Sequence, residues 1–225
     1  MEKSLIKPFI AKRVAQEFTD GMVVNLGIGL PVLCTNYLPE GIHVTVHSEL
    51  GIVGQGPAPD AEHADPMHVV DAGGSPSSVV LGGAFTDSSD SFALVRGGHE
   101  DAEVLGGLEV DEEGSLANWI IPGKKMPGMG GAMDLLVGAK KVIVAMEHTA
   151  KGNPKILKKC RLPYTAVHCV NMIVTEMGVM NVTDKGLELI EYNPEFTLAQ
   201  IIAATEADLI IGPELKKMDM TGFEA

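Results

Sequence analysis

The chain has 225 residues, of which 45% are hydrophobic and 21% charged, and 30 acidic against 17 basic side chains give a formal net charge of −13 at pH 7. So acidic a chain disfavours a nucleic-acid-binding function, and no apolar stretch reaches the roughly 18 residues that a membrane-spanning helix needs. Three cysteines, an odd number without metal-type spacing, argue against a disulfide framework and predict a cytoplasmic protein.

Helical and strand patterns alternate along the first part of the chain. An apolar residue recurs at every fourth position from Ile6 to Phe18, which predicts an amphipathic opening helix. The apolar run at residues 22–26 predicts a buried strand, and Pro31 favours the start of a helix after it. Residues 42–46 alternate between apolar and polar, as a strand does, and this predicted strand leads into Ser48-Glu49-Leu50-Gly51.

A long loop is predicted next, because residues 51–78 are rich in Gly, Pro, Asp and Ala and show little periodicity. Further helices are predicted over residues 88–95, 132–137 and 197–204, and further strands over 102–105, 116–121, 142–146, 179–183, 187–190 and 209–211. Strands that alternate with helices predict an α/β fold with an open, mainly parallel sheet flanked by helices. Without an internal repeat or linker, we predict a single domain over residues 1–225.

Glu49 is the leading candidate for a catalytic residue. It directly follows a predicted strand and comes two residues before a glycine, which places its carboxylate beyond the carboxyl end of that strand, where open α/β sheets bind their ligands. A carboxylate at this place can act as a base or as a covalent nucleophile. From position alone, a solvated loop glutamate is the commoner explanation.

Two other segments carry residues of chemical interest. Gly128-Met129-Gly130-Gly131 precedes a predicted helix, so its backbone N–H groups are candidates to hold an oxyanion or a phosphate, although an ordinary turn explains the glycines as well. By residue type, Glu62, His63, Asp65 and His68 resemble a metal cluster. Spacing on an irregular loop fixes no geometry, so we predict a polar surface loop there and no metal site.

Four longer segments together resemble one known family. They are Ser48–Gly51, Gly106–Asp111, Ala117–Lys124 and Gly128–Leu135. They are similar to segments of the B (beta) subunit of the 3-oxoacid CoA-transferases, a family that includes acetoacetate and butyrate–acetoacetate CoA-transferases. The resemblance runs from about Ile10 to about Ile211, which is nearly the whole chain.

The resemblance implies a fold of the ribose-5-phosphate isomerase and CoA-transferase kind and a partner A (alpha) subunit, with αβ pairs assembled into a heterotetramer or larger. It implies that Glu49 becomes covalently attached to coenzyme A, which is a substrate, so no permanently bound cofactor is expected. Gly128, Gly130 and Gly131 are implied as oxyanion- or CoA-binding residues. Leu50 stands where the family's Ser-Glu-Asn-Gly motif has Asn, which implies a role for Leu50 in substrate specificity.

The implied reaction moves CoA between an acyl-CoA and a short-chain carboxylic acid, such as acetoacetate, butyrate or acetate, by a ping-pong mechanism through a glutamyl-CoA thioester. An acyl-CoA hydrolase stays open as an alternative, as does a non-catalytic or sugar-phosphate-binding member of the same fold superfamily. A Glu49 that lines a pocket with Gly130 would favour the enzyme. A Glu49 that points into bulk solvent would favour the binding protein.

Overall fold

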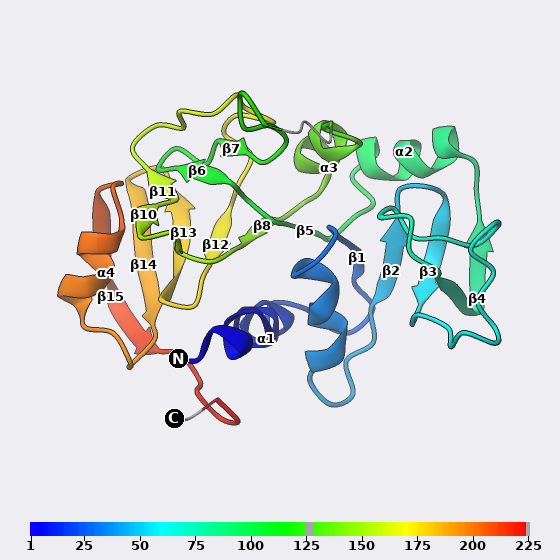
Figure 1. Cartoon of the computed structure of the whole chain (residues 1–225), viewed down its shortest axis with the longest axis horizontal. Coiled ribbons are helices and arrows are strands. Elements are labelled where there is room, and N and C mark those ends of the chain that lie inside the picture. Colours follow the sequence, from blue (N-terminus) through cyan, green and yellow to red (C-terminus); the bar gives the residue numbers. More distant parts are fainter. Residues whose placement is uncertain (125–127, 224–225) are drawn as a thin grey trace.

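The computed structural model describes residues 1–124 and 128–223, and its main feature is a ten-stranded mixed sheet with helices on both faces (Figure 1). The strands follow one another across the sheet in the order β15-β14-β13-β12-β8-β5-β1-β2-β3-β4. Their bounds are β1 (Val23–Leu26), β2 (Thr45–Ser48), β3 (Ile52–Gly56), β4 (Ser78–Phe85), β5 (Ala102–Leu105), β8 (Val142–Ala145), β12 (Met172–Val174), β13 (Gly178–Thr183), β14 (Gly186–Tyr192) and β15 (Leu209–Lys217).

The centre of the sheet is parallel. The strands β12, β8, β5, β1 and β2 pair with one another in the same direction. Antiparallel strands extend both sides, with β13 and β14 beyond β12 and with β3 and β4 beyond β2, while β15 runs parallel to β14. This arrangement confirms the predicted open α/β fold. It also brings the carboxyl ends of five strands to one edge, the place where such sheets bind ligands.

Helices cover both faces of the central strands, as the sequence predicts. The helix α1 (Lys3–Ala15) and the 3₁₀-helix η1 (Pro31–Tyr37) lie on one face, and α2 (Ser88–Arg96) and α3 (Ala132–Gly138) lie on the other (Figure 1). The last helix, α4 (Leu198–Ala204), begins at a capping box in which the Thr197 hydroxyl accepts the Gln200 N–H.

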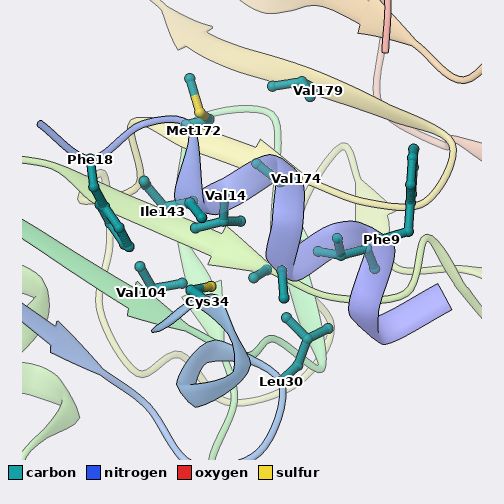
Figure 2. Packing of buried hydrophobic residues seen from close by; sticks show 14 of the residues in the cluster. Phe9, Val14, Phe18, Leu30, Cys34, Val104, Ile143, Met172, Val174 and Val179 are labelled. Carbon is teal, nitrogen blue, oxygen red and sulfur yellow. The ribbon is translucent and has the colours of Figure 1, made fainter. Parts of the chain in front are cut away.

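Two hydrophobic clusters hold these helices to the sheet. Under α1, Val14 packs beside Ile143 of β8, and Phe9 and Val104 of β5 belong to the same buried cluster (Figure 2). Burying one such side chain stabilises the fold by about 1.5–3 kcal/mol, so this cluster fixes α1 on the sheet. The second cluster lies on the opposite face and includes Leu105, Leu136, Val144, Leu189 and Ile201.

Several predicted elements were wrong in extent. The strand predicted over residues 42–46 is β2 at Thr45–Ser48, and the one predicted over 209–211 continues to Lys217 as β15. The predicted loop at residues 51–78 contains β3, a glycine-rich strand without alternation that is defined by its pairing with β2 and β4. The predicted strand at residues 116–121 is limited to β7 (Leu116–Ala117), because the backbone N–H of Asn118 turns to the Thr165 hydroxyl, 3.0 Å away, instead of to a strand.

A smaller three-stranded sheet joins β7 to β6 (Glu109–Asp111) and β11 (Ile156–Leu157), and β9 (Thr149–Ala150) forms a short hairpin with β10 (Asn153–Pro154). This part of the chain lies beside the carboxyl end of β8 (Figure 1). None of the helices in the described residues combines the length and the apolar character required to cross a lipid bilayer.

Candidate active site

Glu49 stands at the corner of a tight turn between β2 and β3. The Gly51 N–H donates to the Ser48 carbonyl, 2.9 Å away, so Glu49 and Leu50 are the two central residues of the turn. Gly51 has a φ of +118°, and a Cβ atom added to it would stand 2.2 Å from the Thr86 carbonyl oxygen. Only glycine fits this position, and the turn therefore holds Glu49 at the carboxyl end of β2, where the sequence predicts it.

A cleft of about 520 Å³ joins Glu49 to the glycine-rich segment before α3. A Cβ atom added to Gly131 would stand 3.3 Å from Cγ of Glu49, so the two residues are direct neighbours. Gly130 lines the same cleft, which is the arrangement that favours an enzyme over a binding protein. The cleft is lined by Asn25, Leu26, Gly27, Ile28, Glu49, Ala72, Leu105, Gly106, Gly107, Leu108, Asn118, Gly128, Met129, Gly130, Gly131, Ala132 and Leu135.

The structure does not bring Leu50 into this cleft. Its side chain leaves the other corner of the turn and is 54% exposed. Ile28 at the cleft wall and Phe85, which pairs with Ile52 just beyond the turn, are also exposed apolar side chains. Apolar surface is therefore exposed on the cleft wall, through Ile28, and at the turn beside it, through Leu50 and Phe85.

A buried polar cluster lies beneath Glu49. His47 on β2, Asn25 on β1 and Glu103 on β5 are in register on adjacent parallel strands, so their side chains share one face of the sheet. Nδ1 of the His47 ring is hydrogen-bonded to the Glu100 carboxylate, and Nε2 lies 2.9 Å from the Ser91 hydroxyl. That hydroxyl donates to the backbone carbonyl of Glu49 at 2.8 Å. The cluster is thus bonded directly to the turn that carries the candidate nucleophile.

Glu103 is the exceptional member of this cluster. Its side chain is 0% exposed, and among the described residues neither carboxylate oxygen has a hydrogen-bond partner. Burial raises the pKa of Glu103 well above its ordinary value, and the nearby charges of Glu100 and Glu49 raise it further. Nδ2 of Asn25 is also buried without a partner in the described chain. A signal for the cluster was present in the sequence, because Asn25 and Glu103 are polar residues inside apolar strands.

The polar loop residues stay apart from this site. His63 bonds to Asp60 at 2.7 Å and His68 to Asp65 at 2.9 Å, both on exposed surface, and these bonds lower the pKa of each aspartate. Nowhere in residues 1–124 and 128–223 do three or more His, Cys, Asp or Glu side chains gather as a metal site would require.

Comparison with known proteins places these features in context. The family model described as coenzyme A transferase matches residues 8–204. The acetate CoA-transferase beta subunit of Escherichia coli strain K12 is 55% identical over 210 residues, which are 93% of this chain and 95% of that protein. A mitochondrial succinyl-CoA:3-ketoacid coenzyme A transferase of Mus musculus is 47% identical over 219 residues, 96% of this chain. The chain spans only 42% of the length of that mouse protein.

Solved structures share the fold. An acyl-CoA transferase from Escherichia coli O157:H7, solved as the apoenzyme, superposes with a TM-score of 0.73 at 23% identity, over 97% of this chain and 44% of that one. The same enzyme has been solved as a thioester complex with CoA, and this structure superposes with a TM-score of 0.68 at 24% identity. At such identities the likeness concerns the fold alone.

Proposed function

The chain belongs to the coenzyme A transferase family, and on that premise we propose that it is a beta subunit whose Glu49 carries CoA from an acyl-CoA to a short-chain carboxylic acid. The observation that supports this most is the contact between Glu49 and Gly131 in one cleft at the carboxyl edge of the sheet. The site pairs a carboxylate with a glycine-rich backbone, which is the equipment that acyl transfer to a side chain needs.

The proposed reaction begins when a carboxylate oxygen of Glu49 attacks the thioester carbonyl of the acyl-CoA. The C–S bond breaks, which gives an acyl–glutamyl anhydride and CoA thiolate. The thiolate then attacks the glutamyl carbonyl, releases the first carboxylate and leaves a glutamyl-CoA thioester. A second carboxylate runs these steps in reverse. One thioester replaces another, so the exchange is close to balanced in energy and follows ping-pong kinetics.

Each attack develops negative charge on a carbonyl oxygen, and the glycine-rich segment is proposed to stabilise it. Gly128 and Gly130 have φ of +96° and +56°, conformations that glycine adopts freely, and Gly131 is the N-cap residue of α3. Their backbone N–H groups are the candidate oxyanion donors beside Glu49. In other enzymes, removing one such donor lowers the rate by roughly 10²–10³-fold.

A partner alpha subunit is proposed to complete the site. The bacterial relatives are named as beta subunits, and the mouse relative is more than twice the length that this chain matches. The exposed apolar side chains of Ile28 on the cleft wall and of Leu50 and Phe85 at the turn fit a surface that another subunit covers. The covering subunit would also keep out water, which otherwise hydrolyses the anhydride. We expect αβ pairs in a heterotetramer or larger assembly.

The substrates are proposed to be short-chain acids, among them acetate and 3-oxoacids, the classes named in the relatives. Leu50 would border the acid substrate only where the partner subunit closes over the turn, and Leu50 would influence substrate specificity through that contact.

The free cysteines Cys34, Cys160 and Cys169 fit a protein of the reducing cytoplasm.

The test is an assay of the co-expressed alpha and beta subunits with a panel of acyl-CoA donors and acid acceptors. Formation of a new acyl-CoA that depends on the added acid supports the proposal. Release of free CoA without dependence on an acid would instead support the hydrolase alternative, and binding without turnover would support the non-catalytic one.

A further inference from the structure

The protons of the buried cluster beneath Glu49 can be assigned by counting donors. The Ser91 hydroxyl has one proton, and it goes to the Glu49 carbonyl, which can only accept. Nε2 of His47 must therefore donate to Ser91, and a single proton is left between Nδ1 of His47 and Glu100. Whichever of the two holds that proton, the His47–Glu100 pair has no net charge.

Among residues 1–124 and 128–223, Glu103 consequently has no cation to pair with. Beside it on the sheet stand Asn25 of β1 and Val142 of β8, and the acidic groups that act on it are Glu49 and Glu100, the latter sharing its proton with His47. The two lysines that precede β8 are engaged elsewhere, as Lys140 pairs with Asp101 and Lys141 with Glu17. An ionised Glu103 would be a buried charge among carboxylates, which is among the costliest arrangements in a protein.

A protonated Glu103 removes this conflict. Its O–H is the donor that the cluster lacks, because Oε2 of Glu100 is buried without a partner in the described residues. Its second oxygen is an acceptor for Nδ2 of Asn25, the unpaired donor on the neighbouring strand. Small side-chain rotations would let these groups meet, since residues in register on adjacent strands stand side by side.

We propose that Glu103 is a positioning residue that keeps its carboxyl proton at neutral pH and so leaves the negative charge of the site on Glu49. This inference rests on the proposed function of Glu49. If Glu103 lost its proton, a second buried negative charge would stand beside the oxyanion that forms when Glu49 attacks the thioester. The attack would then slow. Glu103 would thus act as a switch that turns transfer off as the pH rises through its ionisation.

The test compares the co-expressed αβ complex with the variants Glu103→Gln and Glu176→Gln. Glu176 is a matched control, because burial raises the pKa of this carboxyl too. It lies in a separate cluster, where it accepts the backbone N–H of His148. We expect kcat of the unaltered complex to fall on the alkaline side by about tenfold per pH unit. Glu103→Gln, which is neutral at every pH, should lose this alkaline fall, whatever its activity at pH 7. Glu176→Gln should retain the fall.

An alkaline fall in kcat that persists in Glu103→Gln would overturn the proposal, and so would a Glu103→Gln complex that folds but is inactive at every pH.

A second measurement does not depend on activity. At pH 7, the infrared difference spectrum between the unaltered complex and Glu103→Gln should contain the carbonyl band of a protonated carboxyl, and the absence of that band would contradict the proposal. If Gln does not fold, Glu103→Met serves in both experiments. A complex without any transferase activity would refute the proposed function, while the infrared band would still decide the state of Glu103.

Discussion

The backbone of Gly131 lies directly against the side chain of Glu49. A Cβ atom added to the glycine would stand 3.3 Å from Cγ of the glutamate. The same Cβ would stand 2.7 Å from the Phe92 ring. The space at Gly131 is therefore shared between the candidate nucleophile and an aromatic side chain of α2. Any side chain placed there has to move one of them.

Gly131→Ala is expected to lower transfer activity while the protein still folds. Gly131 has a φ of −81°, which alanine adopts without strain, so the effect would come from crowding. The Phe92 ring has to shift most, and Glu49 has to give by a few tenths of an ångström, so the loss in kcat should stay below the roughly 10²-fold that a 1 Å misplacement can cost. The measurement is kcat of the αβ complex, with circular dichroism as the folding control. Full activity in Gly131→Ala, or its recovery when Phe92→Leu is added, would show that Glu49 is not what the alanine displaces.

Ser91→Ala is expected to destabilise the chain and to weaken catalysis together. Ser91 is fully buried and links the His47 ring to the Glu49 carbonyl, so its loss leaves buried polar groups unpaired, at a cost of about 1–3 kcal/mol in the free energy of unfolding. The control is Ser89→Ala on the exposed side of α2, which should change that free energy by less than about 0.5 kcal/mol. Urea denaturation measures the free energy of unfolding of the two variants, and kcat of the αβ complex measures the effect on catalysis. Equal effects of the two substitutions would contradict this role of Ser91.

Lowering the pH should destabilise the protein at Glu17, whose carboxylate pairs with Arg13 of α1 and with Lys141, which precedes β8. Burial raises the pKa of Glu17, but hydrogen bonds from Lys141 and Arg13 and their charges outweigh it, so the net pKa is lowered from 4.5. A carboxyl with a lowered folded-state pKa contributes stability above its unfolded pKa and loses it as pH falls through the folded one. We expect the stability advantage of the unaltered protein over Glu17→Gln to be present at neutral pH and to vanish well below pH 4.5. The measurement is the urea midpoint of both proteins between neutral pH and pH values well below 4.5. A stability advantage that does not change with pH would refute this role of Glu17.

Leu50→Asn is expected to raise the preference for 3-oxoacids. An amide beside the nucleophile can donate to a keto oxygen, whereas leucine cannot, and sites that pair a polar substrate group discriminate by such bonds. The measurement is the ratio of kcat/KM for acetoacetate over butyrate in the αβ complex. Leu81→Asn is the control, since Leu81 is an exposed leucine on β4 away from the turn. An unchanged ratio in Leu50→Asn, or an equal change in the control, would remove Leu50 from the specificity determinants.

The place of Glu49 was predictable because local sequence determines it. An alternating strand followed by a glycine-ended turn specifies where the carboxylate leaves the sheet, and Gly51 has to be glycine for the reason that the structure shows. The glycine-rich segment before α3 was predictable on the same grounds. Their contact was not derivable from local pattern, because it depends on how α3 packs over the end of β2.

The buried cluster escaped prediction for a different reason. His47, Asn25 and Glu103 come from three strands and meet only through the parallel register of β2, β1 and β5. The alternation pattern assigns polar residues to a solvated face, so His47 and Glu103 were not recognised as buried. The strand β3 was missed likewise, because its partners rather than its own residues define it.

The central claim is that Glu49 is the covalent nucleophile, and the most direct measurement is to trap the intermediate. The αβ complex is incubated with acyl-CoA and treated with hydroxylamine, which converts a glutamyl thioester to a hydroxamate and releases CoA, and mass spectrometry then locates the modified residue. The account predicts a single modified glutamate, Glu49, and no modification in Glu49→Ala or without acyl-CoA. It also predicts that Glu49→Asp, whose carboxylate is withdrawn by more than 1 Å, loses on the order of 10²-fold in kcat. Modification of another residue, or transfer that persists in Glu49→Ala, would contradict the account.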